Sequence, residues 1–365
     1  MTQHTDPTRG RKRQSPSAIA NWKRGTAAVS LAATAALVSS VLGTTHVASA
    51  STSQPTLVVY SAQGYDSTVV NAFHKATGIP VSLDDDSTGP LLTKVQAEIG
   101  HPQWGVLWVD GDTAFASLDK QGQLLRNWEP NVQFNALGKA TIPKDKSYIP
   151  TGVTMAGTLV YDSAVVKNPP KTWNQLLSSE WKGQIGMNDP AVSGPTYPFV
   201  AGMMNHLGGV SKGESFYSKL KANGMQIFQT NGDTLHALQT GQIKLALIQS
   251  SAGIGAGFQV STIKTAYLAP STLIPGVIGI DRHVSKAEQA EAKKFVEYVL
   301  SKKGQAVQKS GDPTGDSLYW PVLKGVAPKA GVPSINKIKY QHINPYLWGS
   351  RENTVNTWFT NNIVQ

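Results

Sequence analysis

Small polar residues stand directly after two apolar runs of strand length near the start of the folded chain. Ser61-Ala62-Gln63 follows Thr56–Tyr60, and Ser87-Thr88-Gly89 closes the polar loop after Ile79–Leu83. The carboxyl ends of neighbouring parallel strands meet at one edge of an α/β sheet, where ligands bind. Each loop also leads into a helical pattern, so its hydroxyls and backbone N–H groups suit an anion. The residues thus indicate a small-ligand site, with an ordinary α/β domain whose loops bind nothing as the alternative.

Reactive side chains do not assemble into a recognisable enzyme motif. The histidines after residue 50 do not form the helical His-Glu-x-x-His pattern of zinc proteases. They are His74, His101, His206, His236, His283 and His342. The chain has no cysteine, which excludes thiol catalysis, disulfides and zinc–thiolate sites. Asp84-Asp85-Asp86 lacks the alternate spacing of a calcium loop and indicates a solvated loop. We expect no enzyme, cofactor or metal, with a secreted hydrolase that uses an unrecognised carboxylate pair as the alternative.

Two glycine-containing patterns also favour structural explanations. Gly209–Gly213 matches the G-x-S-x-G elbow of serine hydrolases, but a helical pattern precedes it where the elbow needs a strand. We interpret it as a turn between helices. Gly253–Gly257 lacks the spacing of a dinucleotide or phosphate loop, and we predict a tight bend there.

The elements that must position the polar loops alternate between strand and helix. Apolar, β-branched runs predict strands at 56–60, 79–83, 105–109, 154–162, 185–187, 226–229, 245–248, 264–268 and 277–280. Helical periodicity is found around 69–73, 90–99, 115–118, 199–204, 216–222, 234–240, 286–300 and 352–358. This order predicts an α/β fold. We expect 154–162 to cross into a second lobe, and 264–268 and 277–280 to return to the first.

The first 50 residues have the composition of a secretory signal peptide. A basic segment up to Arg24 precedes a small, apolar run at 25–42, and Ala48-Ser49-Ala50 fits a cleavage site after Ala50. This segment holds six of the 33 basic and one of the 23 acidic residues, which leaves 27 against 22, a net charge of +5. No basic stripe with interleaved aromatics remains, so we expect no nucleic-acid partner. Without a cysteine for a lipid anchor, we expect the periplasm.

Five segments together carry a resemblance to a known family: the run from Leu57 to Glu98, GVLWVDGDTAFASL from Gly105, WKGQIGMNDPAVSGPTY from Trp181, EAKKFVEYVLSKKGQ from Glu291 and DPTGDSLYWPVLKGV from Asp312. With these segments, the chain resembles ABC-transporter extracellular solute-binding proteins, in the branch of ferric-ion-binding and 2-aminoethylphosphonate-binding proteins. The resemblance implies a two-lobed (type 2) periplasmic-binding-protein fold, each lobe a mixed sheet flanked by helices, with a ligand cleft between them. It also implies a small-molecule solute, an inner-membrane ABC permease as partner, and a monomer.

The resemblance and the strand ends together imply the domain boundaries and the site. We expect a signal peptide at 1–50, the first lobe at 51–153, the second at 154–262, a return to the first at 263–312, and a C-terminal segment, 313–365, packed mainly on the second. The candidate ligand-binding residues are Ser61, Ala62, Gln63, Ser87, Thr88, Gly89, Asp110, Asp112, Ser193, Thr196, Tyr197, Asn231, Ser250 and Ser251.

One departure from the branch bears on the solute. Iron-binding members carry two adjacent tyrosines where this chain has Ser250 and Ser251. Ferric iron favours phenolate or carboxylate oxygens, whereas hydroxyls and helix N-termini suit a phosphonate, phosphate ester, sulfonate or carboxylate. Asp110 or Asp112 would then meet an amino group on the same solute, or simply serve the helix N-terminus. A ferric-iron receptor with other ligands and an adhesion protein are the alternatives.

Overall fold

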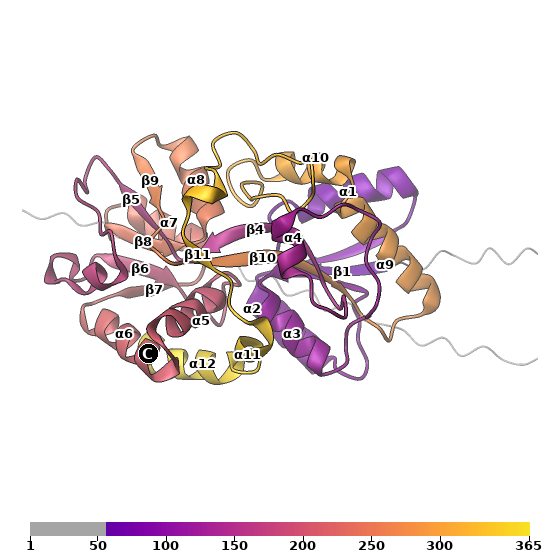
Figure 1. Cartoon of the computed structure of the whole chain (residues 1–365), viewed down its shortest axis with the longest axis horizontal. Coiled ribbons are helices and arrows are strands. Elements are labelled where there is room, and N and C mark those ends of the chain that lie inside the picture. Colours follow the sequence, from indigo (N-terminus) through magenta and orange to yellow (C-terminus); the bar gives the residue numbers. More distant parts are fainter. Residues whose placement is uncertain (1–55) are drawn as a thin grey trace, which may run out of the picture. The chain divides into compact units, whose positions relative to one another are not determined.

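The computed structural model describes residues 56–365 as a mixed α/β protein built on two sheets (Figure 1). The predicted signal peptide and the leader up to Pro55 lie outside the described residues. Within 56–365, no helix combines the length and the apolar character needed to cross a membrane.

The first sheet carries the first two polar loops at its edge. Its strands run in the order β11-β10-β3-β1-β2, with β4 also paired to β10. They are β1 (Leu57–Ser61), β2 (Val81–Asp85), β3 (Val106–Asp110), β4 (Ile149–Ala156), β10 (Ser271–Ile280) and β11 (Tyr340–Gln341). β1 is parallel to β2 and β3, so the loops that follow all three lie at the same edge, as the sequence predicts.

Helices cover both faces of this sheet. They are α1 (Asp66–Thr77), α2 (Thr88–Ala97), α3 (Asp112–Lys120), α9 (Lys286–Val299) and α10 (Lys302–Gly311), with a short α4 (Ala136–Thr141). Alternation along β3 separates two cores. Trp108 packs with Phe73 of α1 and Phe295 of α9, whereas Leu107 packs with Leu91 of α2 and Phe115 of α3. The side chains of successive strand residues point to opposite faces, so one strand serves both cores.

The second sheet has the order β7-β6-β8-β5-β9. Its strands are β5 (Thr158–Asp162), β6 (Ile185–Asn188), β7 (Gln226–Phe228), β8 (Leu245–Ile248) and β9 (Ile263–Ala266). Its helices are α5 (Thr196–Leu207), α6 (Val210–Ala222), α7 (Asn231–Gln239) and α8 (Ser250–Gln259), with 3₁₀ turns at Trp173–Leu177 and Ser179–Trp181. Because β6, β7 and β8 are mutually parallel, the polar residues after them also meet at one edge.

The connection between the sheets differs from the single strand predicted at 154–162. β4 belongs to the first sheet and β5 to the second, and Gly157 between them has a φ of 65°. The Phe199 ring also leaves no room for a Cβ at this position. Glycine is therefore required both by the positive φ and by the close packing. The chain crosses once here and returns through β10.

The prediction that a strand at 264–268 returns to the first lobe is wrong. β9 pairs with β5 in the second sheet, from Leu159–Ala266 to Asp162–Ile263. Only β10 returns to the first. An isolated apolar run predicts a strand but carries no information on its pairing partner, which explains the error.

The C-terminal segment is shared between the lobes. Tyr319, Trp320 and Val322 pack in the core of the first sheet. Most apolar residues from 343 onward, including Trp348 and Phe359, pack in the core of the second, whereas Tyr346 packs against the core of the first. The prediction that 313–365 packs mainly on the second lobe therefore fits only its second half. That half contains α11 (Pro345–Gly349), α12 (Glu352–Phe359) and a final turn, Thr360–Val364, after a 3₁₀ turn at Ile335–Lys337.

The tight bend predicted at 253–257 is wrong, because these glycines lie inside α8. Gly255 packs so closely on the backbone of Thr314 that a Cβ would clash, and Gly253 packs in the same way on Val160 and Thr265. The glycines thus allow close helix packing and do not mark a turn. The predicted turn between helices at 209–213 is shorter than expected, since α6 already begins at Val210.

Candidate functional site: a cleft between the lobes

Loops of the two lobes touch each other at the start of α2 and α5. The backbone N–H of Gly89 donates a hydrogen bond to the carbonyl oxygen of Val192 over 3.1 Å. Gly194 lies against the Thr88 side chain with no space for a Cβ between them. Helix α2 begins at Thr88 and α5 at Thr196, so two helix N-termini from different lobes come together here.

A partly buried amide–carboxylate network also links the lobes. Asp110, at the end of β3, accepts hydrogen bonds from Gln63 Nε2 (3.1 Å) and from Gln249 Nε2 (2.7 Å). Gln249 follows β8 of the second sheet and also donates to Thr154 Oγ1 over 3.0 Å. Burial raises the pKa of Asp110, while the hydrogen bonds from the two glutamines oppose that shift.

A second half-buried carboxylate, Asp316, lines a common cavity with the first. Its oxygens accept from the Gly64 N–H over 2.8 Å and from Ser251 Oγ over 3.4 Å. Burial, and next the negative charge of Asp110, raise the pKa of Asp316 to about 7. Both carboxylates line a cavity of about 10 Å³, and no Lys or Arg of the described residues lines it. Two carboxylates without a neighbouring cation favour a positively charged or proton-donating group between them.

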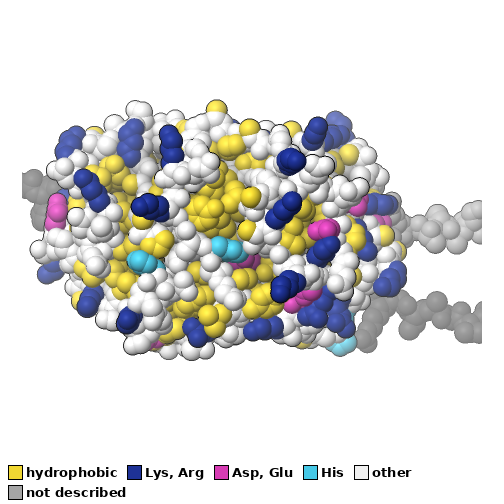
Figure 2. All heavy atoms as spheres, viewed as in Figure 1, with side chains coloured by type: hydrophobic (Ala, Val, Ile, Leu, Met, Phe, Trp, Pro, Cys, Tyr) yellow, Lys and Arg dark blue, Asp and Glu magenta, His cyan; other side chains and the backbone are white. Residues whose placement is uncertain are grey.

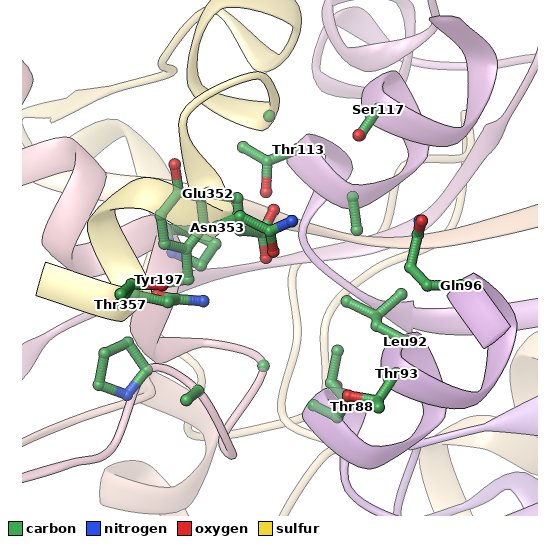
Figure 3. Close-up of a pocket in the computed structure, with 18 of the residues that line it drawn as sticks. Thr88, Leu92, Thr93, Gln96, Thr113, Ser117, Tyr197, Glu352, Asn353 and Thr357 are labelled. Carbon is green, nitrogen blue, oxygen red and sulfur yellow. The ribbon is translucent and has the colours of Figure 1, made fainter. Parts of the chain in front are cut away.

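A much larger cavity, of about 650 Å³, is also lined by Asp110. Figure 3 shows a close-up of residues that line it. One wall comes from α2 and α3 of the first lobe, with Thr88, Leu92, Thr93, Gln96, Thr113 and Ser117. The facing wall comes from α5 and α12, with Tyr197, Glu352, Asn353, Asn356 and Thr357. Asp110 lines both cavities and so lies at their junction. Most of the lining side chains are neutral hydroxyls and amides.

Several residues predicted for the site come together in this cleft. Gln63, Thr88, Gly89, Asp110 and Tyr197 line one of the two cavities. The hydroxyl of Tyr197 donates to the carbonyl oxygen of Trp348 over 2.5 Å, so its ring is held beside α11.

Ser193 and Asn231 are joined through Asn188 at the end of β6. Asn188 Nδ2 donates to Ser193 Oγ over 3.0 Å and to Asn231 Oδ1 over 2.7 Å. Asn231 in turn reaches the Gln249 side chain over 3.4 Å. The amide chain therefore connects the second-lobe loops with the network around Asp110.

Other predicted site residues have internal partners. Ser61 Oγ accepts from the Gln63 N–H over 3.2 Å, and Ser250 Oγ accepts from the Met155 N–H in β4 over 3.0 Å. Both serines are fully buried. Ser251 contacts Asp316, as described above. The Ser250 hydroxyl thus fixes α8 of the second lobe to β4 of the first.

Asp112 faces away from the cleft, toward the C-terminal segment. Its Oδ2 lies 2.8 Å from His342 Nε2. Burial lowers the pKa of His342, but the hydrogen bond to Asp112 and the charge of Asp112 together outweigh burial and raise the pKa above its usual value. Asp110 is thus the better placed of the two aspartates for contact with a solute.

Three further predicted residues lie at element ends. Ser87 is the N-cap residue of α2 without a side-chain capping bond, and Thr196 is buried in the first turn of α5. Ala62 packs partly buried against the apolar core under α2 and α3.

Sequence reasoning missed the contribution of the C-terminal segment. Asp316 lies within a segment quoted for the family resemblance, which was the one available signal. Glu352 and Asn356 belong to an amphipathic helix that was predicted, but nothing in its pattern indicates that its polar face lines a cavity. On the face shown in Figure 2, Lys and Arg side chains are scattered and form no stripe.

Comparison with known proteins places this cleft in context. The model of the bacterial extracellular solute-binding protein family matches residues 68–339. Putative 2-aminoethylphosphonate-binding periplasmic proteins of Salmonella paratyphi A and Salmonella typhimurium are each 24% identical over 242 residues. That alignment covers 64% of this chain and 68% of each relative.

Solved structures share the fold at lower identity. The periplasmic binding protein AfuA from Actinobacillus pleuropneumoniae, with fructose-6-phosphate bound, has a TM-score of 0.74 at 18% identity and covers 84% of this chain and 98% of its own. Iron-bound HitA from Pseudomonas aeruginosa has a TM-score of 0.69 at 19% identity, with coverages of 83% and 98%. With the family model matching most of its length and the two-lobed fold in place, the chain belongs to the bacterial extracellular solute-binding protein family.

Proposed function

We propose that this chain is exported to the periplasm, with cleavage after Ala50, and hands a small solute to an ABC permease as a non-enzymatic, monomeric receptor. The family is one of solute-binding proteins, and the Salmonella relatives carry the name of periplasmic proteins. The solute we propose is zwitterionic, with a phosphonate- or phosphate-like anion and an amino group.

The meeting of two helix N-termini is the observation that carries the anionic end of this proposal. Asp316 already accepts hydrogen bonds from the Ser251 hydroxyl at the start of α8 and from the Gly64 N–H before α1, so these donors are not free for a solute. That leaves the starts of α2 and α5, where Thr88 and Gly194 touch across the cleft. Helix N-termini carry partial positive charge and stabilise anions without a Lys or Arg. An anion in the large cavity that Thr88 and Gly194 line would receive hydrogen bonds from both lobes and hold them together.

The amino group of the solute is proposed to lie near Asp110 and Asp316. The negative charge of Asp110 raises the pKa of Asp316, and a cation that enters between these two half-buried carboxylates relieves the repulsion. This arrangement also argues against a purely anionic solute, because an anion at the junction would meet two like charges. The name of the Salmonella relatives, with an amine and a phosphonate on one molecule, agrees with the proposal.

Mass spectrometry of the small molecule released from the purified, denatured protein tests the proposal. We expect a phosphonate or phosphate that carries an amine, present at a constant ratio to protein and returned unchanged by fresh protein. A released compound with neither group would contradict the charge assignment. Conversion of the compound by fresh protein would instead favour a secreted hydrolase.

A further inference from the structure

We infer that helix α12 forms a wall of the solute site that recognises hydroxyl groups, so that the solute is a hydroxylated amino phosphate or phosphonate. The inference rests on the proposed function and extends it from the charged ends of the solute to its body. Neither the starts of α2 and α5 nor the Asp110–Asp316 pair requires α12, so α12 is an independent part of the site.

The size of the large cavity is the first argument. Its volume of about 650 Å³ falls within the range of sites that hold whole ligands of drug size. A two-carbon aminophosphonate that bridged the starts of α2 and α5 and Asp110 would leave most of this volume to water. The space between α3 and α12 is thus available for a larger solute (Figure 3).

The chemistry of the lining is the second argument. Facing side chains from α2 and α3 include Thr93, Gln96 and Thr113, and those from α12 include Asn353, Asn356 and Thr357. Hydroxyls and amides both donate and accept hydrogen bonds, as the hydroxyl groups of a polyol or sugar do. No Lys or Arg of the described residues lines the cavity, so its far end offers no pairing for a second anion.

An excess of acceptors points in the same direction. Asn356 Oδ1 is buried and has no hydrogen-bond partner among the described residues. Burial raises the pKa of the neighbouring Glu352 to about 7, while hydrogen bonding with Thr113 opposes the shift. Buried acceptors in native proteins normally have a donor. A solute that brings O–H donors to this wall supplies them.

The anchoring of α12 explains how such contacts would depend on closure. Val355 and Phe359 fix the helix in the core of the second lobe, whereas α2 and α3 belong to the first. Gly349, just before α12, packs on the backbone of Thr113 in α3 with no room for a Cβ. The two walls therefore belong to different lobes, and a hydroxylated body would be gripped between them only when the lobes are together.

Calorimetry with three compounds separates this inference from the proposed function. Glucosamine 6-phosphate carries an amine, an anion and hydroxyls. 2-Aminoethylphosphonate lacks the hydroxyls, and glucosamine lacks the anion. We expect glucosamine 6-phosphate to bind at least about tenfold more tightly than 2-aminoethylphosphonate, as for one or more added hydrogen bonds to buried groups. Equal affinity for these two would overturn the inference.

Variants of α12 make the test specific. Asn356→Ala and Asn353→Ala should each weaken the binding of glucosamine 6-phosphate about tenfold. The affinity for 2-aminoethylphosphonate should stay within twofold of the wild-type value. Thr354→Ala is the matched control, because Thr354 is exposed on the same helix and does not line the cavity. Exposed Asn353 keeps the test valid if Asn356→Ala fails to fold. Equal losses for both compounds would contradict the inference.

Two further outcomes distinguish the proposals. Binding of glucosamine as tightly as its 6-phosphate, with the same loss in Asn356→Ala, would support the hydroxyl wall and contradict the anionic end. Failure of all three compounds to bind would contradict both.

Discussion

The two cavities that meet at Asp110 differ in size and in charge. The cavity between Asp110 and Asp316 has about 10 Å³ and contains two carboxylates, whereas the cavity between α3 and α12 has about 650 Å³ and is lined mainly by neutral groups. A small, charged space that is partly shielded from water discriminates by charge, because a carboxylate there is costly without a compensating charge. A large, hydroxyl- and amide-lined space discriminates by shape and by matching hydrogen bonds. The comparison suggests that the small cavity recognises the charge of a solute, whereas the large cavity recognises its shape and its hydrogen-bonding groups.

The largest effect is expected from removing the charge at the junction. Asp110→Asn keeps the shape of the side chain but leaves an amino group on the solute without its carboxylate. Binding of 2-aminoethylphosphonate should weaken about a hundredfold, since truncating one partner of a buried charged pair costs several kcal/mol. Ethylphosphonate, which has no amine, should not weaken. Calorimetry on both compounds measures the effect, and equal losses would mean that Asp110 only holds Gln63 and Gln249 in place.

The hydroxyls at the start of α2 and α5 should contribute next. Hydrogen bonds to a charged acceptor contribute about 1.5–3 kcal/mol each, so Thr88→Val and Ser193→Ala should each weaken an anionic solute by roughly ten- to a hundredfold. A helix cap alone contributes only about 1 kcal/mol of stability. Ser87→Ala, at the N-cap of α2, is a useful comparison. Unchanged affinity in Thr88→Val and Ser193→Ala, with a lower melting temperature, would reduce these residues to structural roles.

The pKa of Asp316 predicts a smaller effect, on stability. Its value of about 7 in the folded chain lies above the usual 3.8, so the folded state binds this proton more tightly than the unfolded state. Its contribution to stability is fully present below about pH 3.8 and is lost as the pH rises through about 7. The melting temperature of Asp316→Asn should therefore fall less than that of the wild type between pH 5 and 8.

Glu352 and Asp66 also have raised pKa values. Both residues are present in the wild type and in Asp316→Asn, so their effects cancel when the melting temperatures of the two proteins are compared. Parallel melting curves over the whole pH range would show that Asp316 titrates normally. The saturating addition of a solute with an amine should reduce the difference, because a cation beside Asp316 lowers its pKa.

No effect at all is expected from ferric iron. Ser250 and Ser251 stand where the resemblance to iron-binding members implies two tyrosines, and the Ser250 hydroxyl already accepts the Met155 N–H. Titration with ferric citrate should give no tyrosinate-to-iron charge-transfer absorption and no stoichiometric uptake. Tight binding of one equivalent would show that other oxygen ligands replace the tyrosines.

The sequence predicts the parts of the cleft that depend on local order. Strand, polar loop and helix follow each other along the chain, so residues such as Thr88 and Asp110 can be placed at a sheet edge from their neighbours alone. Strand pairing and side-chain orientation depend on distant contacts. That is why the sequence assigns β9 to the wrong sheet, and why nothing local distinguishes Asp110 from Asp112, which turns toward His342.

The C-terminal contributions illustrate the same limit. Asp316 and Asn356 lie more than two hundred residues from Asp110 in the sequence, and only the packing of the final segment on both cores brings them to the cleft. The helical period of α12 predicts a buried apolar face but not what its polar face meets.

Calorimetry of the wild-type protein with 2-aminoethylphosphonate, ethylphosphonate and ethanolamine tests the central claim most directly. The three compounds carry both charges, the anion alone and the cation alone. A zwitterion-binding cleft predicts saturable binding of 2-aminoethylphosphonate that is at least about tenfold tighter than binding of either single-charge compound. Ethylphosphonate or ethanolamine binding as tightly as 2-aminoethylphosphonate would contradict the account.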